Sequence, residues 1–395
     1  MSSRKKIKIA IIGSTGSIGT TSLKIIQDKK KLFNVELLVC NESEKIILAQ
    51  IKKFSPKNVF IKNLLIQNKI KKKLNRDKLK VNFINKFEDI NKIYSKQNKF
   101  DKVIIGISSI NGLKYSMKFI KYSNEILLAN KESLVCGGKI LLNAAKKYNC
   151  KILSIDSEHY CIAETLKYEK MDNISSIYLT ASGGPFFGDD KKTFAKAPIS
   201  KVLKHPNWSM GKKISVDSAT MANKIFEMIE AHVLFDIPIE KLKIKIHKES
   251  LIHSAVLFNN GLVKLIMHDT SMIIPIRNSL LGCMHIKKIN DKNFFDDNKN
   301  FRLSFEEADV KNFQLIPLGF RVLKLGHAAW ILFNVFNDYF VNKFLEKKIF
   351  FYQIEKNLIK IFSNKDINLY CKKKISNFKD VLKTIKYANN FVKNL

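Results

Sequence analysis

Two pairs of acidic side chains have the types and spacing of a site for a divalent cation. Asp156 and Glu158 follow the apolar run 152–155, and on a regular strand residues two apart would point to the same face. Glu227 and Glu230 lie on an amphipathic helical stretch. Either pair alone is typical of a solvated surface, but a third ligand from the helix would complete a carboxylate site for Mg²⁺ or Mn²⁺. The spacing leaves open which helical glutamate would serve.

Small polar and basic side chains nearby in the sequence suit a phosphate group. Ser218, Asn223 and Lys224 lie in the first part of the helix that carries the acidic pair. We predict this helix over 218–235. Hydroxyl, amide and ammonium donors together are typical of phosphate binding. Ser218 is also a suitable N-cap for that helix. A second loop, 180–185, reads TASGGP and would present a hydroxyl and backbone N–H groups.

Two further segments carry side chains that a reaction would use. Trp208 and Met210 lie in a loop bounded by Pro and Gly, which indicates either a lid that excludes water or a Trp packed in the core. Lys131 and Glu132 follow an apolar strand and would face a cofactor and a substrate, although the same pattern also begins an ordinary helix.

A glycine-rich turn near the start of the chain indicates a nucleotide. Gly13, Gly16 and Gly19 stand between a predicted strand (7–12) and a predicted helix (21–27). The spacing is a variant of the dinucleotide fingerprint, in which glycines let the backbone approach a pyrophosphate at a helix N-terminus. A merely tight turn is the alternative.

The end of the next strand should distinguish NAD from NADP. An acidic group there usually binds a ribose 2′-hydroxyl, and a basic group binds a 2′-phosphate. Glu42 favours NAD and nearby Lys45 opposes it, so these residues leave the cofactor open.

The predicted elements divide the chain into regions that would position these groups. Apolar runs at 7–12, 35–39, 103–105 and 126–129 alternate with helical stretches, as in a doubly wound parallel sheet. Later strands include a hairpin that turns at 259–261. We therefore predict an α/β protein with a Rossmann-like N-terminal domain (1–155), an α+β catalytic domain (156–285), a linker (286–312) and a C-terminal helical bundle (313–395).

The charge of the chain does not indicate a nucleic-acid-binding protein. Lys and Arg number 70 against 35 Asp and Glu, which gives a net charge of +35 over 395 residues. Only five of the cations are Arg, whereas nucleic-acid readers favour Arg for bidentate contacts to phosphate and guanine. The lysines are also spread along the whole chain. We expect no nucleic-acid partner.

Composition also bears on the compartment. No run approaches the roughly 18 apolar residues of a membrane helix, and the apolar stretch after the basic start is shorter than the roughly 7–15 residues of a signal peptide. The six cysteines include no C-x-x-C pair and no zinc spacing. We expect a cytoplasmic protein with reduced thiols and no membrane partner.

Six ordered motifs together resemble one family. They are GSTGSIG (13–19), LLANKESLV (127–135), DSEH (156–159), TASGGPF (180–186), HPNWSMGKKISVDSATMANK (205–224) and the glutamate pair with its following Ala (227–231). The chain is similar in these motifs to the 1-deoxy-D-xylulose 5-phosphate reductoisomerase family. The resemblance implies a homodimeric enzyme that converts a phosphorylated sugar, 1-deoxy-D-xylulose 5-phosphate, to 2-C-methyl-D-erythritol 4-phosphate in non-mevalonate isoprenoid biosynthesis.

The resemblance also implies a role for each matching residue. The cofactors would be NADPH and Mg²⁺ or Mn²⁺, with Co²⁺ as a further candidate. The metal ligands would be Asp156, Glu158 and Glu227. The catalytic residues would be Lys131, Glu158 and His205. The substrate would be bound by Lys131, Ser157, Glu158, Ser182, His205, Trp208, Met210, Ser218, Asn223, Lys224 and Glu227. NADPH would be bound by Thr15, Gly16, Ser17, Ile18, Asn41, Asn130, Glu132 and Gly211.

Several positions depart from the family pattern. The family usually has Gly followed by Lys or Arg where this chain has Asn41 and Glu42, which bears directly on 2′-phosphate recognition. Ile225 and Phe226 replace a Gly-Leu pair, so packing beneath the phosphate groups must differ. The Asn-Ala-Ala-Asn-Glu stretch of the last domain corresponds to 334–338 here, which reads NVFND.

Two other functions are alternatives to this one. A different NAD(P)-dependent oxidoreductase would need a thiol near the nicotinamide, and Cys136 is the candidate by position. A basic binding protein without catalysis would show an Arg-rich and aromatic surface with steep salt dependence. Neither would require the three carboxylates together, so metal dependence separates the enzyme from both alternatives.

Overall fold

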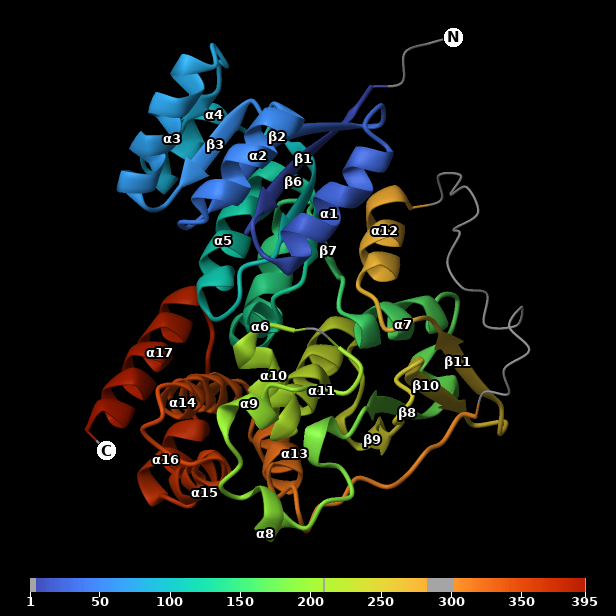
Figure 1. Cartoon of the computed structure of the whole chain (residues 1–395). Helices are drawn as coiled ribbons and strands as arrows, with labels where there is room; N and C mark the ends of the chain where they lie inside the picture. The colour runs from blue at the N-terminus through green and yellow to red at the C-terminus, as the bar shows by residue number, and fades with distance from the viewer. Residues whose placement is uncertain (1–4, 209, 283–301, 395) are drawn as a thin grey trace. The chain divides into compact units, whose positions relative to one another are not determined.

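The computed structural model describes residues 5–208, 210–282 and 302–394. The chain divides into two units, Met1–Asp156 and Ser157–Leu395, which are considered separately (Figure 1). Most of the predicted linker 286–312, together with Cys283, lies outside the described residues.

A parallel sheet of seven strands forms the first unit, in the order β4-β3-β2-β1-β5-β6-β7. The central strands are continuous apolar runs because helices cover both faces of such a sheet. In β1, for example, Ile9, Ile11 and Ile12 are fully buried. The strands are β1 (Ile7–Ile12), β2 (Phe33–Cys40), β3 (Asn58–Ile61), β4 (Asn82–Phe83), β5 (Phe100–Ile105), β6 (Ser123–Leu128) and β7 (Lys151–Ser154).

Helices connect successive strands of this sheet, as the alternation of apolar runs predicts. They are α1 (Ser17–Asp28), α2 (Glu44–Phe54), α3 (Leu64–Arg76), α4 (Ile90–Ile93), α5 (Asn111–Phe119) and α6 (Lys131–Lys147). All strand pairs are parallel, so the loops that follow the strands meet at one edge of the sheet. That edge carries the glycine turn, Asn41 and Asn130.

The second unit contains a smaller, mixed sheet in the order β11-β10-β8-β9. Its strands are β8 (Ile174–Ala181), β9 (Leu242–Ile246), β10 (Ile252–Phe258) and β11 (Val263–Met267). The predicted hairpin is confirmed: β10 and β11 are antiparallel, and Gly261 in the turn has φ +85°, which a residue with a Cβ rarely adopts.

The other main elements of the second unit are helices. The first group is α7 (Ser157–Thr165), α8 (Lys191–Phe194), α9 (Ile199–Val202), α10 (Lys212–Ala219), α11 (Ala222–Phe235) and α12 (Ile273–Leu281). The C-terminal group is α13 (Leu315–Leu325), α14 (His327–Leu345), α15 (Phe351–Phe362), α16 (Lys365–Cys371) and α17 (Phe378–Lys393). Figure 1 shows α13 and α14 beside α11 and α10, which they contact. The predicted α/β class with a helical C-terminal region is confirmed.

The predicted single helix over 218–235 is wrong at its start. The chain forms two helices, α10 and α11, that meet at a corner where Met221 has φ +66°. Ser218 lies in the last turn of α10 and therefore does not cap the following helix. A local sequence pattern cannot detect such a corner, because the positive φ of a buried Met is stabilised by its surroundings.

Among the described residues, the model contains no helix with the length and apolar character of a membrane span.

Candidate active site

The glycine turn has the close packing that its three glycines permit. Gly13 has φ +90°, and a Cβ there would lie 2.7 Å from the Gly106 carbonyl oxygen. A Cβ on Gly19 would lie 2.4 Å from the Gly13 carbonyl oxygen, so α1 approaches β1 closely. Thr15 and Gly16 lead into α1, which begins at Ser17 and leaves its first N–H groups without a side-chain cap. This is the arrangement of an anion-binding helix N-terminus.

Asn130 organises the end of β6 at the same edge. Its Oδ1 accepts the Ser133 N–H at 2.8 Å, and its Nδ2 donates to Glu132 Oε2 at 2.6 Å and to the Ser109 carbonyl at 2.9 Å. Lys131 follows in the first turn of α6, and its ammonium group forms an ion pair with Asp156. The predicted cofactor residues Asn130 and Glu132 are therefore part of one rigid turn.

Asn41 and Glu42, which we predict to distinguish NAD from NADP, are exposed. Asn41 and Glu42 follow β2, and the Asn41 carbonyl accepts the Asn63 N–H at 3.1 Å. Gly211, the last predicted cofactor residue, is the N-cap of α10 in the second unit.

Asp156, Glu158 and Glu227 converge, as predicted. Each offers a carboxylate oxygen, and the three oxygens lie within 4.8 Å of one another. The secondary structure around Glu158 differs from the predicted one, because Glu158 lies in the first turn of α7 and not on a strand. Three carboxylates fit a hard divalent cation, which prefers oxygen ligands. The donor set therefore suits Mg²⁺ or Mn²⁺.

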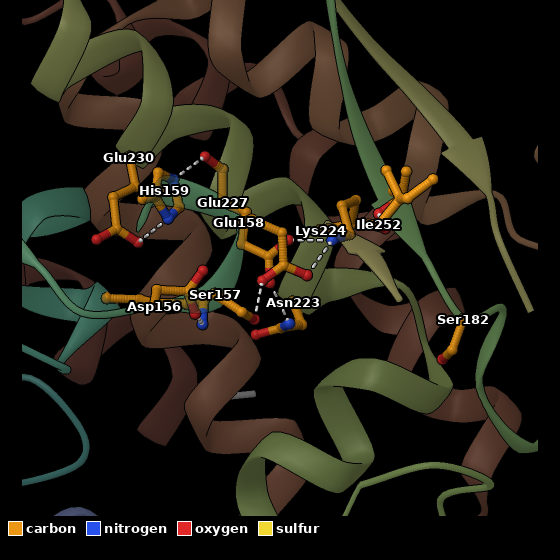
Figure 2. Close-up of polar contacts among 12 residues, drawn as sticks. Asp156, Ser157, Glu158, His159, Ser182, Asn223, Lys224, Glu227, Glu230 and Ile252 are labelled. Atoms are coloured by element: carbon orange, nitrogen blue, oxygen red, sulfur yellow. Dashed lines mark hydrogen bonds and ion pairs between the residues drawn. The ribbon is translucent and has the colours of Figure 1, made fainter. Parts of the chain in front are cut away.

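Glu227 and Glu230 face different partners, which answers the question that their spacing leaves open. Glu230 Oε2 lies 3.5 Å from Nδ1 of His159, and both side chains are almost fully buried. The other ring nitrogen of His159 lies 2.9 Å from the Glu227 carbonyl oxygen. Figure 2 shows Glu230 directed to His159, while Glu227 lies with Glu158. Glu227, and not Glu230, therefore stands in the group of three converging carboxylates among the described residues.

Lys224, one of the predicted phosphate-binding residues, contacts two of the three carboxylates. Its Nζ lies 3.1 Å from Glu158 Oε1 and forms a second ion pair with Glu227 (Figure 2). Burial opposes the charge of this ammonium group, but the two carboxylates outweigh burial and raise its pKa above the ordinary value. Asn223 Nδ2 donates to Glu227 Oε1 at 2.6 Å, and Ser157 Oγ donates to Glu158 Oε2 at 2.6 Å.

His205 contacts Ser182, which lies on a different loop. Its Nε2 is 3.0 Å from Ser182 Oγ, and the same hydroxyl accepts the Gly184 N–H at 3.1 Å. Nδ1 of His205 accepts the N–H groups of Asn207 and Trp208 at 3.1 and 3.0 Å. Burial lowers the pKa of His205 to about 4, so the ring is neutral at pH 7. Because Nδ1 accepts two N–H groups, the single proton of the ring is on Nε2.

Trp208, one of the two residues of the predicted lid, lies next to a histidine pair. Trp208 is half-buried and lies edge-on to His253, with ring centroids 5.9 Å apart. His253 in turn stacks on His268 at 4.1 Å. Trp208 is thus not packed in the core, and closure of this loop stays a prediction.

Sequence reasoning missed His159 and His253 as partners of the site. Two signals were present: His159 directly follows the acidic pair, and His253 is a polar residue inside the apolar strand β10. The alternative nucleophile Cys136 is fully buried within α6. A thiol in that position cannot reach a substrate in this conformation.

Three family models match the chain. The 1-deoxy-D-xylulose 5-phosphate reductoisomerase model covers residues 9–138, its C-terminal domain model covers 152–235, and a further DXP reductoisomerase C-terminal domain model covers 267–391. Together they span most of the chain, including the C-terminal helical region.

Relatives and solved structures agree. The 1-deoxy-D-xylulose 5-phosphate reductoisomerases of Pelagibacter ubique and Clostridium novyi are 41% and 35% identical over 377 and 386 residues. These matches cover 95% and 98% of both chains respectively. A DOX-P reductoisomerase crystallised with NADPH, fosmidomycin and magnesium superposes with a TM-score of 0.88 at 29% identity, and the Zymomonas mobilis enzyme with NADPH superposes at 0.85 and 29%. Both matches cover 98% of both chains. The chain therefore belongs to the 1-deoxy-D-xylulose 5-phosphate reductoisomerase family.

Proposed function

We propose that this chain isomerises and reduces 1-deoxy-D-xylulose 5-phosphate to 2-C-methyl-D-erythritol 4-phosphate with NADPH and a divalent metal, as one step of isoprenoid biosynthesis. The observation that carries the proposal is the convergence of Asp156, Glu158 and Glu227 beside the ammonium group of Lys224. A phosphorylated hydroxy-ketone needs this combination, because its oxygens bind a metal while its phosphate binds cationic and polar donors.

Asp156, Glu158 and Glu227 would hold Mg²⁺ or Mn²⁺, with Co²⁺ as a further candidate. A bound cation polarises a carbonyl and lowers the pKa of a neighbouring hydroxyl. Ser157 and Asn223 orient two of the ligands, since they donate to Glu158 and Glu227 respectively. Lys131 holds the third ligand through its ion pair with Asp156.

Ser182, Ser218, Asn223 and Lys224 would bind the phosphate and neighbouring oxygens of the substrate. A Cβ on Gly184 would lie 3.1 Å from the Ser218 carbonyl oxygen, so the loop that carries Ser182 is packed against the end of α10. Asn223 and Lys224 then follow in the first turn of α11. Binding of the phosphate away from the reacting carbons would supply the energy that closes the Trp208 and Met210 loop over the substrate.

His205 would bind a substrate oxygen as a neutral donor. Its Nε2–H now points to Ser182, and the backbone N–H groups on Nδ1 keep this tautomer. A neutral imidazole donates a hydrogen bond without adding a charge to its surroundings. Lys131 and Glu158 are the remaining candidates for proton transfer, since both lie at the carboxylate cluster.

NADPH would bind at the N-terminus of α1 and along the adjoining strand ends. Thr15, Gly16, Ser17 and Ile18 would face its pyrophosphate, because the glycine turn brings backbone N–H groups to the surface. The other proposed contacts are Asn41, Asn130, Glu132 and Gly211. The reduced nicotinamide supplies the hydride that the reduction requires.

The domain roles, the assembly and the compartment are parts of the same proposal. The predicted domain 1–155 would bind NADPH, 156–285 would bind metal and substrate, and 313–395 would support the site. We propose a homodimer in the cytoplasm, where the buried cysteines that the structure describes (Cys40, Cys136, Cys150, Cys161 and Cys371) would remain reduced.

The decrease in NADPH absorbance in the presence of 1-deoxy-D-xylulose 5-phosphate tests the function. Turnover should require both the substrate and Mg²⁺ or Mn²⁺. Asp156→Asn should abolish turnover while NADPH binding persists, and exposed Asp172 offers Asp172→Asn as the matched control with unchanged activity. Turnover by folded Asp156→Asn that equals the control would refute the metal assignment.

A further inference from the structure

We infer that an ion network beneath α10, formed by Lys213, Asp217, Asn337 and Asp338, positions the groups that bind the substrate phosphate. The inference rests on the proposed phosphate role of Ser218 and its neighbours. It gives a function to the stretch 334–338, which the site described above does not use.

The corner between α10 and α11 needs support from outside. Ser218 lies in the last turn of α10, and Asn223 lies in the first turn of α11. Between them, Met221 is buried and has φ +66°, a backbone conformation that a non-glycine residue holds only when its surroundings impose it. Two backbone hydrogen bonds span the corner, from Met221 N–H to the Ser218 carbonyl and from Lys224 N–H to the Met221 carbonyl, both 3.1 Å.

Lys213 joins the two helices to a third. Its Nζ lies 2.8 Å from Asp217 Oδ2, one turn along α10, and 3.1 Å from Asp338 Oδ1 on α14. The same Nζ lies 4.8 Å from the centroid of the Phe226 ring on α11, which is a cation–π contact. One ammonium group thus contacts α10, α11 and α14.

Asp217 is the buried centre of the network. Its side chain is only 2% exposed, and its Oδ1 accepts a hydrogen bond from Asn337 Nδ2 at 2.7 Å. A buried carboxylate is stable only when its charge is compensated and its oxygens are hydrogen-bonded. Because the partners of Asp217 lie on α10 and α14, these interactions fix the position of α10 relative to α14. Asn337 and Asp338 are separated from Asp217 by about 120 residues of sequence, so the C-terminal helices set the position of a segment far from them in the chain.

The position of α10 determines where both proposed phosphate-binding segments lie. They are the loop with Ser182 and the corner between α10 and α11. Ser218 directly follows Asp217, and a Cβ on Gly184 would lie 3.1 Å from the Ser218 carbonyl oxygen. The Gly184 N–H in turn bonds to Ser182 Oγ. A shift of α10 would therefore change the spacing of Ser182, Ser218 and Asn223 together.

The test separates positioning from mere structural support through the Michaelis constants. In Asp338→Asn, we expect KM for 1-deoxy-D-xylulose 5-phosphate to rise by about five- to tenfold, because small displacements of binding groups are costly. KM for NADPH and kcat should change less than about twofold by the same reasoning. A purely structural role would lower the folded fraction, hence kcat and the melting temperature, and would leave both KM values unchanged.

Two further variants keep the outcome clear. Asp338→Glu retains the charge that contacts Lys213 and should restore most of the substrate KM. Glu346→Gln is the matched control, because Glu346 is an exposed acid at the end of the same helix and pairs with exposed Lys348. Lys213→Met should show a larger effect on substrate KM than Asp338→Asn, since it removes the contacts to all three helices.

The failures of the two proposals are distinguishable. Ser218→Ala and Asn223→Ala test the phosphate assignment directly and should raise substrate KM. If they do so while folded Asp338→Asn and Lys213→Met do not, the positioning inference is wrong and the site stands. If Ser218→Ala and Asn223→Ala leave substrate KM unchanged, the phosphate assignment fails and the inference fails with it.

Discussion

Nε2 of His205 lies 3.0 Å from the hydroxyl oxygen of Ser182, which is 23 residues away in the sequence. The opposite ring nitrogen accepts two backbone N–H groups, and burial lowers the pKa of the ring to about 4. The loop after β8 is thereby joined to the segment that carries Trp208, through an imidazole that is neutral at physiological pH.

The neutral state of His205 should contribute to stability in a defined pH range. The ordinary pKa is 6.5 and the folded value is about 4, so below 6.5 the unfolded state binds the proton more readily. This contribution to the free energy of unfolding is present above pH 6.5 and is lost as the pH falls toward 4. Chemical denaturation of wild type and His205→Gln at a series of pH values should show a smaller decrease over that interval in the variant. Parallel curves would exclude His205 as the source.

The two helical glutamates should respond differently to the loss of charge. Glu227→Gln should weaken Mn²⁺ binding by about a hundredfold, because it removes a proposed ligand. Glu230→Gln should change Mn²⁺ binding much less and should lower the melting temperature, because Glu230 is buried against His159. Electron paramagnetic resonance of free Mn²⁺ measures both affinities without turnover. Equal losses in the two variants would contradict the assignment.

Lys224 should have opposite effects on metal and substrate. Its ammonium group faces Glu158 and Glu227, and it repels a cation that these carboxylates would bind. In Lys224→Met we expect Mn²⁺ to bind more tightly in the absence of substrate, while KM for the phosphorylated substrate rises by about tenfold or more. Calorimetric titration and steady-state kinetics check the two halves. Weaker metal binding in a folded variant would show that Lys224 supports the carboxylate cluster and does not compete with the metal.

Glu42 should oppose binding of the 2′-phosphate of NADPH. It is exposed after β2, at the sequence position that usually reads the ribose. Glu42→Lys should raise the ratio of NADPH to NADH affinity by about tenfold, because a repulsive charge becomes an attractive one. Nicotinamide fluorescence gives both dissociation constants, and Glu240→Lys, at an exposed position of the second unit, controls for the change in net charge. An unchanged ratio would place the 2′-phosphate away from Glu42.

Two glycines of the N-terminal turn should differ in their tolerance of a methyl group. A Cβ on Gly19 would lie 2.4 Å from the Gly13 carbonyl oxygen, so Gly19→Ala forces backbone atoms apart and should cost about 1–3 kcal/mol of stability. The corresponding distance for Gly16 is 3.5 Å, and its φ of −79° suits alanine. Gly16→Ala should cost less than about 1 kcal/mol. Urea denaturation compares the two, and equal costs would contradict the close approach of α1 to β1.

The sequence alone predicts the doubly wound sheet, the hairpin at Gly261, the helical C-terminal region and the convergence of Asp156 and Glu158 with a helical glutamate. These features depend on short-range properties: apolar runs of strand length, glycine where φ is positive, and acidic residues directly after a strand. The ordered motifs extend this to a family, which the comparisons confirm. The individual roles of the site residues stay predictions.

Tertiary structure decided the rest. It selected Glu227 over Glu230, divided the predicted helix at Met221, assigned the His205 proton to Nε2, and placed Asn337 against Asp217. Each of these outcomes depends on which elements pack together, because a side chain chooses among partners that are distant in sequence. Local patterns specify the backbone of an element, whereas burial and charge compensation between elements specify which of its polar groups face one another.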